Sequence, residues 1–117
     1  MTDVIDTRTK AVVRFTKAGF HRWDHASTAR RYLANPHRHL FHVEAGVELT
    51  NNDREIEFHD LLDFCQDHFI VMDTWSCEMA AENLLNALRK KWPDRFMSVG
   101  VFEDGECGAV ITEEVRK

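Results

Sequence analysis

The sequence predicts an α+β fold in which a four-stranded antiparallel sheet carries two helices on one face. Four segments alternate apolar and polar residues, as strands with one buried face do. Two segments between the second and third strands instead repeat apolar residues at helical spacing. The resulting order, β-β-α-α-β-β, groups strands with strands and helices with helices, which is typical of an antiparallel sheet. A chain of 117 residues suits one domain, spanning residues 1–117.

The first two strands are predicted at residues 11–21 and 37–50. In the first, Val13 and Phe15 alternate with polar neighbours. The second is the clearest strand of the chain, because the alternation holds along its whole length. Residues 22–36 show no period, and this absence predicts a long loop between the two strands.

The two helices follow a turn. NND, residues 51–53, is typical of a turn, and the REIEF segment after it is expected to return as a strand end. Residues 59–69 then change to a helical period. Residues 76–92 form the clearest helix, which Ser76 can cap and Pro93 ends.

The last two strands are predicted in RFMSVGVFE, residues 95–103, and in GAVITEEV, residues 108–115. Asp104-Gly105 between them is a strong hairpin signal. Four strands in a small chain leave exposed sheet edges, and association of subunits is one way to cover them. The sequence therefore favours a homo-oligomer.

Composition argues against several classes of function. A net charge of −5 without a stripe of Lys and Arg argues against a nucleic-acid partner. No apolar run approaches the roughly 20 residues that span a bilayer, and the polar start MTDVIDTRTK is unlike a signal peptide. Three cysteines without CxxC spacing favour a reducing compartment. These features predict a cytoplasmic protein with no membrane partner.

Histidines mark one face of the second predicted strand. His37 and His39 lie two residues apart, so a strand places both on the face that continues into an apolar row. If the first two strands pair, His21 at the end of the first falls close to them. Three imidazoles with one open position are the ligand set of a catalytic zinc. The alternative to a zinc site is that these histidines lie at the rim of the core and hydrogen-bond to other protein groups.

Glu103 is a second candidate site residue. Met97, Val99, Val101 and Glu103 alternate along the third predicted strand, so the carboxylate ends a buried row. A carboxylate can accept two N–H bonds from the amidine edge of a pterin or a guanine. The alternative is an acid at the solvent-exposed end of a strand.

These residues resemble the 6-pyruvoyltetrahydropterin synthase and 6-carboxytetrahydropterin synthase family, which has the tunnelling fold. FTKAGFH, ending at His21, is similar to the family's Phe-x-Ala-Ala-His motif, and HRH at 37–39 to its His-Gly-His. IEF at 56–58 is similar to the family's Met-Asp-Phe segment, and QDHF at 66–69 contains its Asp-His pair. MAAEN at 79–83 is similar to the family's Pro-Thr-Ala-Glu-Asn helix start. VGVFED is similar to the late V-x-V-x-E-T strand.

The resemblance implies a site and an assembly. It implies that His21, His37 and His39 bind zinc and that Glu103 anchors a pterin ring. It further implies that Asp67 and His68 form part of a proton relay. Members of the family associate as trimers and hexamers, with the site between subunits.

The sequence departs from the family at its catalytic cysteine, whose position four residues before the His-x-His motif is occupied by Leu33. A leucine cannot take a proton. Asp24, His25 or Cys77 could replace it, and Cys77 has a physical argument in its favour because a helix N-terminus lowers a thiol pKa. The His-Gly-His glycine and the helix-start threonine are also lost.

The expected function is a zinc-dependent lyase, similar to a pterin synthase, that acts on a dihydropterin triphosphate or a related purine-derived ring. The alternative is a non-catalytic protein that binds or sequesters a pterin or a purine nucleotide, and the missing cysteine favours it. A structural oligomer without a ligand is a third possibility, which leaves the three histidines and the glutamate unexplained.

Overall fold

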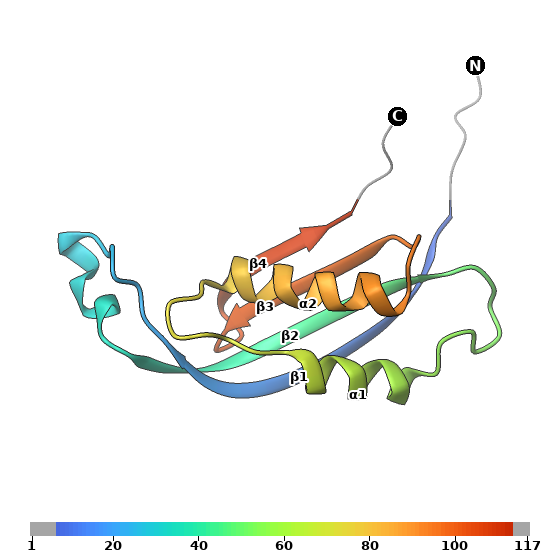
Figure 1. Ribbon diagram of the computed structural model, residues 1–117, viewed down its shortest axis with the longest axis horizontal. Helices are drawn as coiled ribbons and strands as arrows, with labels where there is room; N and C mark the ends of the chain where they lie inside the picture. Colours follow the sequence, from blue (N-terminus) through green and yellow to red (C-terminus); the bar gives the residue numbers. More distant parts are fainter. Residues whose placement is uncertain (1–6, 114–117) are drawn as a thin grey trace, which may run out of the picture.

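In the computed structural model, a four-stranded antiparallel sheet carries two α-helices on one face (Figure 1). The structure describes residues 7–113. The elements are β1 (Thr9–His21), the 3-10 helix η1 (Thr28–Ala34), β2 (His37–Leu49), α1 (Phe58–His68), α2 (Cys77–Lys91), β3 (Met97–Glu103) and β4 (Cys107–Thr112). The predicted α+β class and antiparallel sheet are confirmed.

The sheet has the strand order β1-β2-β3-β4. β1 and β2 pair along their whole length, from Thr9 opposite Leu49 to His21 opposite His37. β3 pairs with β2 so that Glu103 lies opposite Phe41. This register brings the end of β1, the start of β2 and the end of β3 to one end of the sheet.

The core lies between the sheet and the helices. α2 packs on β3 and β4, and α1 packs on β1. Alternate residues of β2 and β3 form its sheet side, with Phe41, Ala45 and Val99 fully buried. The row that begins with His37 and His39 therefore continues directly into the core, as the alternation predicted. No helix among the described residues is long and apolar enough to cross a membrane.

The helix ends follow their capping residues. Ser76 caps α2, with its hydroxyl accepting a hydrogen bond of 3.2 Å from the amide of Met79, as predicted. α1 begins at Phe58, one residue before the predicted start, because the Glu57 carboxylate accepts from the Asp60 amide at 2.9 Å. The Asp104-Gly105 hairpin is confirmed, and both residues have positive φ, of 55° and 73°.

The element order differs from the predicted β-β-α-α-β-β because η1 lies between the first two strands. This segment was predicted as a loop. Its turns are closed by local hydrogen bonds such as Arg30 N–H to Ser27 O at 3.0 Å. None of its residues is buried, so the segment has no apolar period that the sequence could show. The fourth strand ends at Thr112, and the last two residues of its predicted range lie outside the described residues.

The predicted strand end at REIEF is wrong. The Glu55 carboxylate turns back and accepts hydrogen bonds from the Thr50 amide, the Thr50 hydroxyl and the Asn51 amide, each at 2.8 Å. Arg95 also donates to it. Hydrogen bonds from the Thr50 hydroxyl and from Arg95 lower the pKa of Glu55 to about 2. These bonds hold the segment as a loop, and Arg54 adopts a positive φ of 52° there.

Candidate metal centre

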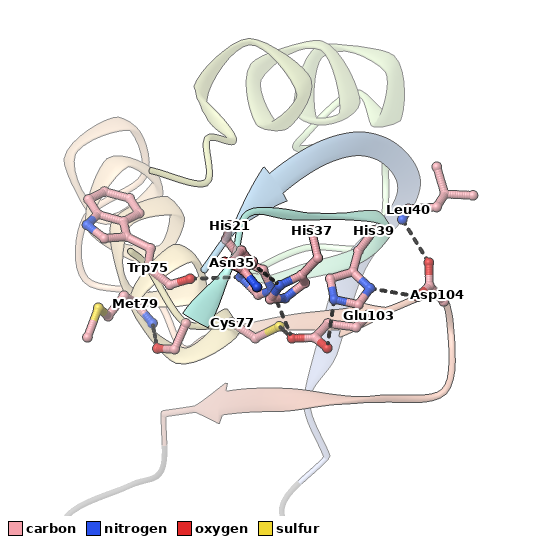
Figure 2. A network of polar contacts seen from close by, with 11 residues as sticks. His21, Asn35, His37, His39, Leu40, Trp75, Cys77, Met79, Glu103 and Asp104 are labelled. Atoms are coloured by element: carbon pink, nitrogen blue, oxygen red, sulfur yellow. Dashed lines mark hydrogen bonds and ion pairs between the residues drawn. The ribbon is translucent and has the colours of Figure 1, made fainter. Parts of the chain in front are cut away.

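The structure brings His21, His37 and His39 together. His21 is the last residue of β1 and pairs with His37, the first residue of β2, so the register of the ladder sets their proximity. The ring centroids lie 4.6, 4.9 and 5.1 Å apart (Figure 2). One ring nitrogen from each residue lies within 4.8 Å of the others. Small side-chain rotations reduce this spacing to the roughly 3.3–3.4 Å that separates ligand atoms around tetrahedral zinc.

All three histidines have the same ring nitrogen bonded to an acceptor. The Nδ1 atoms of His21 and His37 lie 2.9 Å from the carbonyl oxygens of Trp75 and Asn35. The Nδ1 atom of His39 lies 2.7 Å from a carboxylate oxygen of Asp104. These oxygens can only accept, so each Nδ1 carries a proton, and in the neutral form of each ring the lone pair lies on Nε2. Metal-binding histidines are typically held in this way.

Burial favours the neutral, metal-binding form of His21. Its residue exposure is 6%, and this burial lowers the pKa of His21, although the hydrogen bond to Trp75 opposes the shift. The Nε2 atom of His39 is buried and has no hydrogen-bond partner among residues 7–113. A buried ring nitrogen without a partner costs free energy unless an ion or a ligand satisfies it. The chemistry of the three nitrogens therefore fits a divalent metal such as zinc.

Asp104 is a site residue that the sequence interpretation treated only as part of a turn. One carboxylate oxygen accepts from His39 Nδ1 and the other accepts from the Leu40 amide at 2.8 Å. The bond from Leu40, followed by that from His39, lowers the pKa of Asp104. Its φ of 55° belongs to the Asp104-Gly105 hairpin turn, which fixes the position of the carboxylate. The register of β2 on β3 could have indicated this role, because pairing of Phe41 with Glu103 places the turn beside Leu40.

Glu103 also reaches the histidines. Its Oε1 atom lies 3.4 Å from His21 Nε2, and its Oε2 atom lies 3.3 Å from His39 Nε2 (Figure 2). The side chain is 34% exposed. Glu103 thus occupies the end of β3 as predicted, and its carboxylate contacts two of the candidate ligands.

A cavity of about 440 Å³ adjoins the cluster. His21, His37 and Glu103 form part of its lining. The rest of the lining includes two indole rings and two aliphatic side chains: Trp23, Trp75, Leu33 and Met79. Leu33 therefore contributes apolar surface to this cavity.

Cys77 lines the same cavity. It is the first residue of α2, is 5% exposed, and its thiol donates to Glu103 Oε1 at 3.7 Å. The expectation that the helix N-terminus lowers its pKa is wrong. Burial, followed by the nearby Glu103 carboxylate, raises the pKa of Cys77 to about 12. Cys77 is therefore a protonated donor at neutral pH.

The structure does not bring the remaining candidates to the histidines of the same chain. Asp67 and His68 lie on the exposed last turn of α1, where His68 Nδ1 bonds the Phe64 carbonyl oxygen at 2.8 Å. Asp24 and His25 are also exposed, and Asp24 accepts from Arg22 at 2.7 Å. None of these four residues lines the cavity described above.

No protein-family model matches this chain, and no curated protein matches it either. The class of site is therefore defined by the geometry of its own residues: three converging imidazoles beside a partly apolar cavity.

Proposed function

We propose that this protein is a zinc-dependent lyase of the tunnelling fold that acts on a dihydropterin triphosphate or a related purine-derived ring. One observation carries the proposal. Three Nε2 lone pairs converge beside a cavity, and each is fixed by an acceptor on its own Nδ1. The similarity of its sequence motifs to the pterin synthase family supplies the substrate class.

His21, His37 and His39 are the residues that would hold the zinc. When bound, zinc supplies a Lewis acid that polarises a substrate oxygen. The chain's own contribution is a place for a flat ring. Trp23 and Trp75 offer aromatic surface in the cavity wall, and Leu33 offers an aliphatic surface that does not hydrogen-bond to water.

Proton transfer needs a group other than Leu33. Cys77 keeps its proton at neutral pH, because burial raises its pKa to about 12. Asp67 and His68 are the remaining candidates for a relay. Because both are exposed and neither lines the cavity of its own chain, we propose that they act on the site of a neighbouring subunit.

Association of subunits is therefore part of the proposal, as a trimer or a hexamer. Within the described residues, β1 and β4 are the two edges of the sheet. The sheet face turned away from the helices exposes four apolar side chains: Val12, Phe20, Leu40 and Val110. Unpaired edges and exposed apolar surface both favour a neighbouring copy. The free cysteines support a reducing, cytoplasmic location.

Leu33 and the raised pKa of Cys77 favour one alternative. In that alternative, the protein binds a pterin or a purine nucleotide through the same cavity without converting it. Both functions share the zinc and the cavity, and they differ only in whether a proton is moved.

The decisive experiment combines turnover with binding. Zinc-loaded protein is incubated with dihydroneopterin triphosphate, and released triphosphate is measured beside a binding isotherm. His37→Ala removes a candidate ligand, and His59→Ala, on the exposed first turn of α1, is the matched control. We expect turnover in the wild type and in His59→Ala, and none in His37→Ala. Binding without turnover would establish the alternative, and absence of both would refute the two functions.

A further inference from the structure

The Glu103 carboxylate is placed where a metal ligand would be. Its two oxygens face two different imidazoles, at 3.4 Å from His21 Nε2 and 3.3 Å from His39 Nε2. Charge-assisted N–H···O bonds are shorter, at about 2.7–2.9 Å. The His39 nitrogen makes no hydrogen bond with any described residue. These contacts are therefore not ordinary ion-pair hydrogen bonds.

The hydrogen-bond pattern explains why they are long. The Nδ1 proton of His21 is taken by the Trp75 carbonyl, and that of His39 by the Asp104 carboxylate. In the metal-binding, neutral form of these rings each Nε2 atom carries a lone pair, and a carboxylate oxygen also offers only lone pairs. Acceptors that face one another in this way repel unless a cation lies between them. Among the described residues that line the cavity, the Cys77 thiol donates to Glu103, at 3.7 Å from Oε1.

The spacing fits a shared metal ion. Four ligand atoms at about 2.0–2.1 Å from a tetrahedral zinc are separated by about 3.3–3.4 Å. The two separations between Glu103 oxygens and histidine nitrogens match this value, each for a different oxygen, so a rotation of the carboxylate would bring one oxygen to the ion. Carboxylate oxygen is also an ordinary zinc ligand.

We propose that Glu103 is the fourth protein ligand of the metal centre, closing the coordination sphere until a small molecule displaces it. This inference rests on the proposed zinc site of the three histidines. Glu103 also lines the cavity and is one-third exposed, so its side chain has room to turn away from the metal. Once displaced, the same carboxylate faces the cavity, where it can accept N–H groups of a ring. Ligand entry and opening of the metal site are then a single event.

The test measures metal binding without any substrate. Zinc affinity of the wild type, Glu103→Gln and Glu106→Gln is determined by competition with a chromophoric chelator. Glu106 is an exposed acid in the same hairpin and does not line the cavity, so its variant controls for the lost charge. Cobalt(II) then replaces zinc, and its visible spectrum is recorded from acidic to alkaline pH. An open metal position holds water that ionises near pH 7, and a closed one does not.

We expect Glu103→Gln to weaken zinc binding at least about tenfold, because even indirect contacts to metal ligands are worth that much. Glu106→Gln should bind as the wild type does. The cobalt spectrum should be independent of pH near neutrality in the wild type and should change with pH in Glu103→Gln. Circular dichroism of the metal-free variants verifies that they fold.

Three results would overturn the inference. Equal zinc affinities with identical cobalt spectra would remove Glu103 from the metal while leaving the three-histidine site intact. A thiolate-to-cobalt charge-transfer band that disappears in Cys77→Ser would assign the fourth position to Cys77 instead. Absence of metal binding by the wild type would refute the zinc site itself, and the fourth ligand with it.

Discussion

Replacing Asp104 with Asn tests whether the β3–β4 turn controls the metal centre. The substitution keeps the size of the side chain, and Asn tolerates the left-handed backbone that Asp104 adopts at φ 55°. It changes one acceptor oxygen into an NH₂ donor. The variant therefore isolates the hydrogen bonds that Asp104 accepts from Leu40 N–H and His39 Nδ1.

The expected magnitude follows from the two ways in which the amide can lie. If its oxygen stays on the Leu40 amide, its NH₂ faces His39 Nδ1. The ring must then accept there and carry its proton on Nε2, which blocks the nitrogen that would bind metal. If the amide flips, the Leu40 N–H faces a donor instead. The first arrangement disturbs His39 directly, and the second removes the hydrogen bond of the adjacent Leu40 amide. Loss of a partner that orients a ligand typically weakens metal binding by about 10- to 100-fold.

The assay is zinc competition with a chelator, with Asp94→Asn as the control. Asp94 is an exposed aspartate with a φ of 62° in the turn before β3, so it shares residue type and backbone conformation but lies at the other end of the strand. We expect zinc affinity to fall only in Asp104→Asn. Wild-type affinity in Asp104→Asn would refute its role in orienting His39. An equal loss in both variants would show a general effect of charge.

Three further outcomes are expected. Purified protein should carry about one zinc per chain, and elemental analysis should find it lost in His37→Ala; unchanged metal content in that variant would exclude His37 as a ligand. Light scattering should report a trimer or a multiple of it, since β1 and β4 leave two sheet edges; a monomer at micromolar concentration would contradict this. The hydrogen bonds that lower the folded pKa of Glu55 from 4.5 to about 2 stabilise the fold above pH 4.5, and this contribution is lost as the pH falls toward 2. Urea unfolding across this range should show that the difference in free energy of unfolding between wild type and Glu55→Gln becomes smaller at low pH. A difference independent of pH would contradict this role of Glu55.

The sheet and the histidine cluster were predictable because both depend on strand periodicity. Alternation identified β2 along its length and placed His37 and His39 on its inner face. Pairing of successive strands then brought His21 to His37. The cap of α2 and the Asp104-Gly105 hairpin were likewise visible, because each depends on a few neighbouring residues.

The rest depended on contacts between distant residues. Glu55 belongs to a loop because its carboxylate bonds Thr50 and Arg95, and the local pattern of REIEF contains neither partner. The raised pKa of Cys77 follows first from burial and then from the nearby Glu103 carboxylate, and neither can be read from the residues around Cys77 in the sequence. Asp104 acquires its role only when β2 and β3 pair and place it beside Leu40.

The long β1–β2 ladder makes the candidate metal centre depend on the register of two whole strands. His21 meets His37 at the last of the Cα pairs that begin with Thr9 and Leu49. A slip of two residues along this ladder keeps the same side chains facing inward, but it breaks contacts specific to this register, such as the Phe41 ring against Gly19. The same slip carries His21 away from His37 and dismantles the ligand set. Packing along the ladder therefore sets the position of the candidate ligands, and a distant substitution that shifts the register would also move His21 away from His37.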